Sequence, residues 1–255
     1  DFIAATLAAT ILRIPVYWSD YADLKYIYQN LSVWYKNPIG KIVKFCSRFT
    51  KAILLTSESD KRLIEESAGR QLGPKYTVMY YGVLDRPELL NSRYGGENII
   101  FAATSRLVTA KGIGELIEAT IKTRAKHPQA ELWLFGEGPE KEKFEKMAAS
   151  QDYIKFMGYP SDTLNQVAAA DIFVHPSYLE GFSISLIEAA MLGKPIIACR
   201  VGGNTEIIVD GTNGILIREK DSEALAEAMD KLISDEKLRQ KLGEQARLTY
   251  DENYH

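Results

Sequence analysis

Short apolar segments alternate with helical patterns from residue 98 to the end of the chain, and this alternation limits the possible folds more than any other feature. Apolar runs separated by helices are typical of a parallel sheet that is covered on both faces. Segment 87–255 therefore predicts a doubly wound α/β domain. Strands are expected at 98–103, 131–135, 153–156, 171–174, 195–198 and 214–217, with helices between them and two more over 221–250.

The first third of the chain shows a shorter version of the same pattern. A complete doubly wound sheet carries about five or six strands, and fewer are predicted here. Glycine and proline residues between 82 and 96 then interrupt the alternation. We therefore expect two Rossmann-like domains of parallel sheet, residues 1–86 and residues 87–255, of which the first is incomplete. Its three predicted strands lie at 14–18, 52–56 and 76–80.

The charge balance also separates the two segments. Residues 1–86 carry 12 Lys and Arg against 8 Asp and Glu, whereas residues 87–255 carry 19 against 26. Neither segment is basic enough for a nucleic-acid-binding domain. The two cysteines, Cys46 and Cys199, lie in unlike contexts, which favours reduced thiols in a cytoplasmic protein. The longest run without a charged residue, 2–12, is shorter than the roughly 20 apolar residues that cross a bilayer.

Ligands bind beyond the carboxyl ends of the strands in open parallel sheets, so the loops after predicted strands are the candidate sites. The loop after strand 98–103 carries Arg106 and Lys111 before a helix start, which suits a diphosphate. A solvated loop is the plain alternative. The turn after strand 131–135 begins Gly136-Glu137-Gly138-Pro139, which permits close backbone approach. A strand-to-helix turn without a ligand explains that turn equally well.

A third loop, after strand 171–174, carries two carboxylates. Glu180 is predicted in the loop and Glu188 in the following helix, so both can face one ligand. Ser183 or Ser185 can cap that helix, whose first N–H groups form an anion site. Glu188 lies among apolar residues, where a carboxylate needs partners; ligand hydroxyls and a structural cation or amide remain open as those partners. For His175 we favour packing or a loop hydrogen bond over a ligand role.

These blocks resemble the donor-binding domain of family 4 retaining glycosyltransferases, which have the GT-B architecture of two Rossmann-like domains. The resemblance covers about residues 76–250 and is specific because the blocks match in order along the chain. The matching blocks are Ser105-Arg106-Leu107, Lys111-Gly112, Gly136-Glu137-Gly138-Pro139, Phe156-Met157-Gly158, Ala170-Asp171, Pro176-Ser177, Glu180-Gly181-Phe182, Glu188-Ala189, Gly193-Lys194-Pro195-Ile196-Ile197-Ala198, Gly202-Gly203-Asn204-Thr205-Glu206 and Gly211-Thr212-Asn213-Gly214.

The resemblance implies a role for each matched position in binding a nucleotide-diphosphate sugar. Arg106 and Lys111 would bind the diphosphate, and Glu188 would hold the ribose hydroxyls. Glu180 would face the donor sugar near its anomeric carbon, so Glu180, Arg106 and Lys111 are the expected catalytic residues. The other expected donor-binding residues are Gly136, Gly138, Gly158, Tyr159, Leu164, Gly181, Phe182, Ser183 and Ile184, with Gly158, Tyr159 and Leu164 near the base.

The implied activity is that of a retaining, metal-independent hexosyltransferase. It would move a hexosyl unit from a nucleotide-diphosphate sugar to a glycan or lipid-linked acceptor in polysaccharide biosynthesis. The residues agree, because cations and a helix N-terminus stabilise the negative charge that develops on a departing nucleotide. We expect no cofactor and no metal site. A nicotinamide dehydrogenase is disfavoured because no G-x-G-x-x-G opens a βαβ unit. An epimerase of the same fold is disfavoured because the chain carries Lys111 and the two glutamates, Glu180 and Glu188.

The first segment matches this family less well. The run 14–18 resembles a strand that in the family leads into a histidine, but Trp18-Ser19-Asp20 stands here instead. A non-catalytic nucleotide-sugar-binding fragment or module therefore remains the alternative function. The family's opening βα unit is not seen, so we expect a chain truncated at the N-terminus, and also at the C-terminus near residue 253, where a crossing helix would begin.

A basic and aromatic stretch, residues 24–51, suggests a further partner. It holds six Lys or Arg residues, no acidic ones and interleaved aromatics. Such a stretch suits an anionic membrane surface, which would place the protein peripherally at the inner membrane face and favour a lipid-linked acceptor. A solvated helix whose aromatics pack on the sheet explains the same pattern, and we favour that interpretation.

Overall fold

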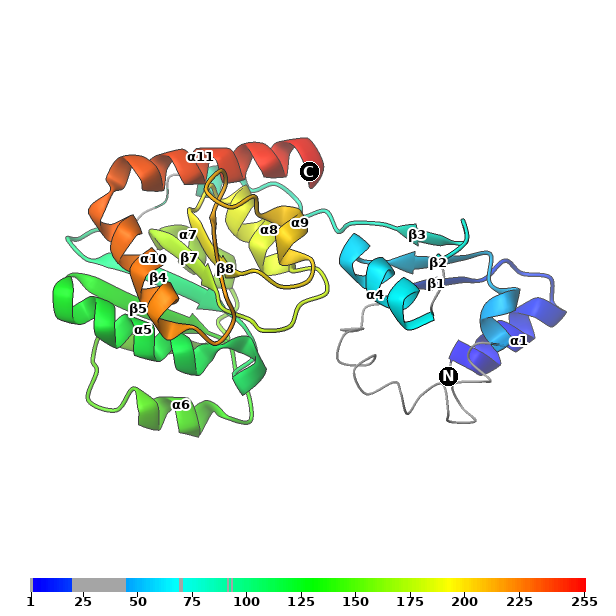
Figure 1. Ribbon diagram of the computed structural model, residues 1–255, viewed down its shortest axis with the longest axis horizontal. Helices are drawn as coiled ribbons and strands as arrows, with labels where there is room; N and C mark the ends of the chain where they lie inside the picture. Colours follow the sequence, from blue (N-terminus) through cyan, green and yellow to red (C-terminus); the bar gives the residue numbers. More distant parts are fainter. Residues whose placement is uncertain (1, 20–44, 69–70, 91, 93) are drawn as a thin grey trace. The chain divides into compact units, whose positions relative to one another are not determined.

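The structure is a computed structural model that describes residues 2–19, 45–68, 71–90, 92 and 94–255 (Figure 1). Within it the chain forms two compact units, Asp1–Tyr81 and Gly82–His255. The sequence placed the division a few residues later, after residue 86. Most of the basic and aromatic stretch, residues 24–44, lies outside the described residues.

The second unit is built on six parallel strands in the order β6-β5-β4-β7-β8-β9. This is the 3-2-1-4-5-6 order of a doubly wound sheet, so the order reverses between β4 and β7. The predicted α/β class is confirmed, and the crevice at this reversal is where such a fold holds a ligand. The strands are β4 (Ile99–Thr104), β5 (Ala130–Phe135), β6 (Ile154–Gly158), β7 (Ile172–His175), β8 (Ile196–Cys199) and β9 (Ile215–Ile217).

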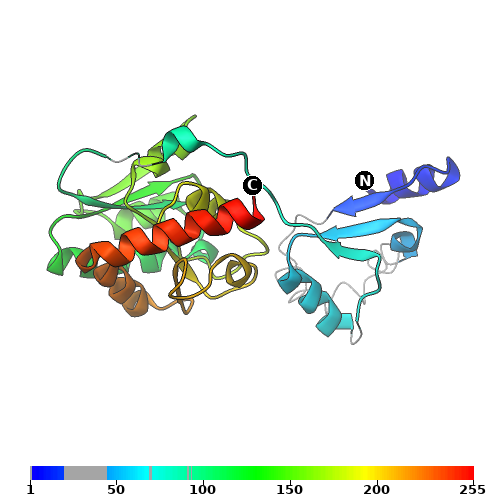
Figure 2. The same cartoon turned by 90° about the horizontal axis from the view of Figure 1, so that it is seen from above.

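Helices cover both faces of this sheet (Figures 1 and 2). On one face, Phe101 of β4 shares an apolar cluster with Leu116 of α5 and Met229 of α10, and these two helices pack together. α8 and α11 also pack against each other, on the face that right-handed connections from β7 to β8 require. The helices are α5 (Ile113–Lys126), α6 (Lys141–Met147), α7 (Thr163–Ala169), α8 (Ile184–Met191), α9 (Asn204–Ile207), α10 (Ser222–Ser234) and α11 (Glu236–Asn253).

Local sequence explains why these elements form where they do. Every residue of β5, β7 and β8 is buried, as expected for strands covered on both faces. Three helices begin after an aspartate whose carboxylate accepts a backbone N–H three residues later, which satisfies an otherwise unpaired donor. These aspartates are Asp162 before α7, Asp221 before α10 and Asp235 before α11.

The first unit holds a small parallel sheet in the order β1-β2-β3, formed by β1 (Tyr17–Ser19), β2 (Ala52–Leu55) and β3 (Tyr76–Val78). Its apolar centre joins Ile53 and Leu55 of β2 to Ile64 of helix α4 (Glu58–Ala68). Before β1 lies helix α1 (Phe2–Ile11), and the Trp18 indole N–H donates to the Thr6 hydroxyl at 2.9 Å. Three strands in this unit agree with the predicted shorter alternation.

Candidate functional site

The loops that follow β4 and β7 meet at the point where the strand order reverses. The Tyr178 backbone N–H donates to the Ala110 carbonyl at 3.0 Å, which fixes the loop after β7 against the short 3₁₀ helix η3 (Thr109–Lys111). As a result, the Lys111 Nζ lies 2.5 Å from Glu180 Oε1, although the two residues are 69 positions apart in the sequence. The first candidate feature is therefore an ion pair that bridges two loops.

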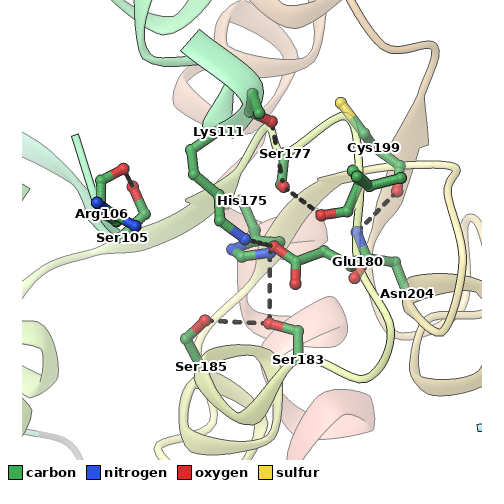
Figure 3. A network of polar contacts seen from close by, with 12 residues as sticks. Ser105, Arg106, Lys111, His175, Ser177, Glu180, Ser183, Ser185, Cys199 and Asn204 are labelled. Carbon is green, nitrogen blue, oxygen red and sulfur yellow. Dashed lines mark hydrogen bonds and ion pairs between the residues drawn. The ribbon is translucent and has the colours of Figure 1, made fainter. Parts of the chain in front are cut away.

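Glu180 is the centre of a larger group of polar side chains (Figure 3). His175, the last residue of β7, has its Nε2 2.9 Å from the same Oε1 atom and 3.3 Å from the Ser183 hydroxyl. The Ser183 hydroxyl lies 3.1 Å from that of Ser185 in the first turn of α8. We refer to Lys111, His175, Glu180, Ser183 and Ser185 as the Glu180 cluster.

The cluster keeps Glu180 ionised. Burial by itself raises the pKa of this carboxyl group, because only 11% of the side chain is exposed. His175 and Lys111 act in the opposite direction and together lower the pKa to about 2. Glu180 is therefore a carboxylate near neutral pH, and Lys111 and His175 both contact its Oε1 atom.

Ser183 corrects one sequence-based expectation. It occupies the N-cap position of α8, as predicted, but its hydroxyl makes no cap hydrogen bond; it contacts His175 and Ser185 instead. The first N–H groups of α8 consequently keep the orphan character of a helix N-terminus. They add a fixed positive partial charge beside Glu180 and Lys111.

A pocket of about 500 Å³ adjoins the cluster at the start of α8. It brings together predicted residues from three separate segments, since Arg106 follows β4, Gly136 follows β5 and Glu188 lies in helix α8. Tyr159, which is 82% exposed, is one of the lining residues. The lining residues are Thr104, Ser105, Arg106, Phe135, Gly136, Glu137, Tyr159, Thr163, Leu164, Val167, Phe173, Ile184, Ser185 and Glu188.

Glu188 contributes a carboxyl group to the wall of this pocket. Burial raises its pKa above the ordinary value, in contrast to the lowered pKa of Glu180. Glu180 thus has two cationic or hydrogen-bonding partners that offset its burial, whereas Glu188 is half-buried in the wall of the pocket. A carboxylate in that position can accept hydrogen bonds from neutral hydroxyl groups of a ligand.

The predicted residues do not all line the pocket. Arg106 does, and its side chain is exposed, whereas Lys111 belongs to the Glu180 cluster. The sequence suggested that both cations act on one diphosphate. Ser185, in the first turn of α8, belongs to the Glu180 cluster and also lines the pocket with Arg106. Of the other predicted contacts, Gly138, Gly158, Gly181 and Phe182 also lie outside the pocket lining, and the Phe182 ring packs on Tyr254 with the ring centres 5.8 Å apart.

The glycines after β5 permit close approach, as predicted, but of protein backbone. Gly136 has φ +134°, and a Cβ there would lie 1.9 Å from the Ser105 carbonyl oxygen. A Cβ on Gly138 would lie 2.3 Å from the Leu107 carbonyl oxygen. These glycines therefore let the loop after β5 lie directly on the loop that carries Arg106. At the end of β6, the Gly158 carbonyl accepts the Gly136 N–H at 2.6 Å.

Backbone of Gly202 and Gly203 makes a similar close contact with the loop that carries Glu180. The Gly203 N–H donates to the Gly181 carbonyl at 2.8 Å, and a Cβ on Gly202 would lie 1.8 Å from the Glu180 carbonyl oxygen. The next residue, Asn204, donates from its amide to the Cys199 carbonyl at 3.0 Å, which anchors this turn to the end of β8 (Figure 3). The matched Gly202-Gly203 block thus positions Glu180 through backbone contact.

Sequence reasoning did not assign His175 to the site, and it considered Ser185 only as a helix cap. The hydrogen bond that was favoured for His175 is confirmed, and its partner is Glu180. The available signal was position, because His175 ends a strand beside the order reversal, where side chains converge.

The described part of the chain contains no group of three His, Cys, Asp or Glu side chains arranged to hold a metal ion. None of the helices that the structure describes is both long enough and apolar enough to cross a membrane.

The chain is similar in structure to GT-B glycosyltransferases, which defines the class of fold. Anabaena HepE, solved in complex with UDP-glucose, has a TM-score of 0.82 to this chain at 22% identity, and the match covers 99% of this chain and 71% of HepE. Sucrose-phosphate synthase from Thermosynechococcus elongatus has a TM-score of 0.78 at 20% identity, covering 99% and 68%.

The sequence comparisons specify the family. The model of the family "Glycosyl transferases group 1" matches residues 91–249. The chain therefore belongs to the group 1 glycosyl transferases, which confirms the glycosyltransferase expectation.

Two curated relatives illustrate the range of the family. The lipopolysaccharide core biosynthesis glycosyltransferase LpsE of Rhizobium meliloti is 31% identical over 153 residues, which are 59% of this chain and 44% of LpsE. The GDP-mannose-dependent alpha-(1-6)-phosphatidylinositol monomannoside mannosyltransferase of Mycolicibacterium smegmatis is 29% identical over 208 residues, covering 76% and 53%. The chain thus spans about half the length of these relatives.

Proposed function

We propose that the protein is a retaining glycosyltransferase that moves a hexosyl unit from a nucleotide-diphosphate sugar to a glycan or lipid-linked acceptor. The observation that carries the proposal is the ionised Glu180, which is paired with Lys111 beside the N-terminus of α8. A pocket that contains a second carboxyl group, Glu188, adjoins this pair. The arrangement offers positive charge for a diphosphate and separate carboxylates for a sugar and a ribose.

Each group has a distinct part in the proposed donor complex. The diphosphate lies over the start of α8 and takes Lys111 as a partner, with Arg106 approaching from the pocket side. Glu188 accepts hydrogen bonds from the ribose hydroxyls. Glu180 keeps His175 as its partner and turns its second oxygen toward the donor sugar. Tyr159 and Leu164 lie on the pocket wall, where we place the base.

The chemistry follows from this placement. When the bond between the anomeric carbon and the β-phosphate oxygen breaks, negative charge develops on the diphosphate and positive charge on the sugar ring. Lys111, Arg106 and the α8 dipole stabilise the former, and the Glu180 carboxylate stabilises the latter. The acceptor hydroxyl attacks from the same face that the nucleotide leaves and gives its proton to the departing β-phosphate oxygen, so the anomeric configuration is kept. We propose that these protein groups act without a metal ion.

The proposal for the acceptor rests on relatives rather than on the site. The Mycolicibacterium relative is named for a phosphatidylinositol mannoside, and LpsE for the lipopolysaccharide core. Both names fit a lipid-linked or glycan acceptor. A peripheral contact with the inner membrane face through residues 24–51 remains part of this proposal, and liposome flotation with anionic and neutral vesicles tests it.

The experiment that tests the function has two stages. Calorimetry of the full chain against the UDP, GDP and ADP sugars identifies the donor, which we expect to stabilise the folded state. Isotope-labelled donor is then followed for transfer or hydrolysis, with and without EDTA, and the anomeric configuration of the product is determined by NMR. Absence of binding throughout the series, or an inverted product, would contradict the proposal.

Donor binding is expected to weaken as the pH falls, through Glu188. Burial raises the pKa of Glu188, and its protonated form offers the ribose one acceptor fewer. Affinity therefore falls below this raised pKa by up to about tenfold per pH unit, whereas Glu180, with a pKa of about 2, stays ionised. Calorimetry with a nucleotide sugar from neutral pH down to about pH 4, near the ordinary pKa of a glutamate, measures the slope.

The variant Glu188→Gln is the matched control for that slope. It keeps one acceptor oxygen but has no proton to gain, so its affinity is expected to be lower at neutral pH and less dependent on pH. A nucleotide sugar is the suitable probe because its diphosphate diester does not titrate in this range. Equal slopes in the two proteins would show that Glu188 does not hold the donor.

The alternative function is a non-catalytic nucleotide-sugar-binding fragment or module. The observation that favours it is the absence of histidine after β1, since the three histidines of the chain are His127, His175 and His255. This alternative predicts donor binding of ordinary affinity with neither transfer nor hydrolysis. The isotope experiment distinguishes the two.

A further inference from the structure

The last turn of α11 is held by residues 82–85, with which the second unit begins (Figure 2). The Val83 N–H donates to the Tyr254 carbonyl at 3.1 Å, and the Tyr250 hydroxyl donates to the Val83 carbonyl at 2.6 Å. Asp85 accepts two hydrogen bonds, each of 2.8 Å, from the guanidinium of Arg247. We call residues 82–85 the entry segment, and these contacts fix it along the end of α11.

The side chain of Tyr254 extends from that turn to the loop that carries Glu180. Its ring packs against Phe182 with the ring centres 5.8 Å apart, and both rings are less than a tenth exposed. The Tyr254 hydroxyl donates to the Glu206 carbonyl of α9 at 3.3 Å, and burial raises its pKa to about 12. Tyr254 therefore contacts the Glu180 loop, α9 and the entry segment at once.

We propose that Tyr254 is a positioning residue for the donor site, which fixes the loop 180–183 through Phe182 and couples that loop to the entry segment. The inference rests on the proposed function, because it concerns the loop that we place over the donor. Phe182 lies between Glu180 and Ser183, both members of the Glu180 cluster. The position of its ring therefore controls the backbone that carries the carboxylate and leads into α8.

Donor affinity depends on the fraction of molecules in which the loop 180–183 has the conformation that binds the donor, which we call the competent conformation. Without the ring of Tyr254, Phe182 loses an aromatic partner, and other loop conformations gain population. Apparent donor affinity falls in proportion to the loss of the competent fraction. The rest of α11 keeps its place, because Leu242 and Ala246 are fully buried further back along the helix. The effect is therefore larger on donor binding than on global stability.

The experiment compares Tyr254→Leu, Tyr254→Phe and Leu242→Ala in the full chain. The probe is whichever UDP, GDP or ADP sugar the wild-type chain binds most tightly by calorimetry. For Tyr254→Leu we expect about three- to tenfold weaker binding, the range of an aromatic pair. Tyr254→Phe keeps the ring contact and is expected to retain most of the affinity. Leu242→Ala should lower Tm more strongly and leave donor affinity unchanged at temperatures where it is folded.

Hydrogen–deuterium exchange gives a second measurement that needs no ligand. In Tyr254→Leu the amides of residues 180–186 should exchange faster, whereas those of β4 and β5 should not change. Unchanged donor affinity and unchanged exchange in Tyr254→Leu would overturn the inference, as would an equal loss of affinity in Leu242→Ala. If the wild-type chain binds none of the nucleotide sugars, the proposed function fails, and the exchange of 180–186 alone decides whether Tyr254 positions the loop.

Discussion

Replacing Lys111 with methionine is expected to slow cleavage of the bond between sugar and nucleotide by about 10²- to 10³-fold. It is also expected to weaken donor binding by about tenfold or more. Methionine keeps most of the length of the side chain but removes the charge. The free protein loses the 2.5 Å ion pair with Glu180, and the donor complex loses a cation at the diphosphate, where charge develops as the sugar leaves. Isotope-labelled donor turnover and calorimetry measure the two effects separately.

Lys122→Met is the matched control for this prediction. Lys122 also forms a 2.5 Å ion pair, with Glu223, but that pair is more exposed and joins two helices, α5 and α10. Exposed pairs contribute about 0–1 kcal/mol, so turnover and donor affinity should both stay at the wild-type level. Wild-type turnover in Lys111→Met would exclude Lys111 from the reaction.

Gly202→Ala is expected to lower the free energy of unfolding by about 2–4 kcal/mol, through a clash of backbone and side chain. Gly202 has φ +45°, and a Cβ there would lie 1.8 Å from the Glu180 carbonyl oxygen. Since both partners are tied to main chain, one loop must move. We expect the Glu180 loop to shift, so that donor binding weakens along with stability. Urea unfolding and calorimetry check the two results.

Gly211→Ala is the matched control for Gly202→Ala, because it introduces backbone strain without a steric clash. Gly211 has φ +73°, and a Cβ there would find nothing within 4 Å. An alanine at that position lowers the free energy of unfolding by about 1–2 kcal/mol, because a residue with a Cβ is strained in the left-handed backbone conformation. Donor binding should not change. Equal losses of stability in the two variants would show that the close approach of Gly202 to Glu180 has no energetic effect.

Much of the fold was predictable because the signals are local. The apolar strands and the helical periodicity of the second unit depend on neighbouring residues, and all six predicted strands are present. The ends are less well predicted. The second of the two helices expected over 221–250 is α11, which continues to Asn253. Helix ends depend on caps and on how the following loop packs, which periodicity does not encode.

The site was predictable as a set of loops but not as a set of contacts. Sequence reasoning selected Arg106, Lys111, Glu180 and Glu188, and it placed them after the strands where ligands bind. It did not predict that Lys111 pairs with Glu180 while Arg106 lines the pocket. That choice depends on β4 and β7 being neighbours, which is a property of the strand order.

The contacts of the glycine blocks were also only partly predictable. Gly136 and Gly138 indicated close approach, and the sequence left open whether a ligand or a simple strand-to-helix turn required it. The structure shows loop backbone instead, at Ser105 for Gly136 and at Glu180 for Gly202. Nothing in the neighbourhood of a glycine identifies which distant segment will lie against it.

The sequence by itself determined the class of fold, the family and the loops that carry charge, because short-range patterns and ordered blocks encode them. The tertiary structure decided which side chains share a hydrogen-bond partner. It brought His175 and Lys111 to the same oxygen of Glu180 and placed Tyr254 on Phe182. These contacts join segments that are far apart in the chain, and they exist only when the sheet order and the helix packing bring those segments together.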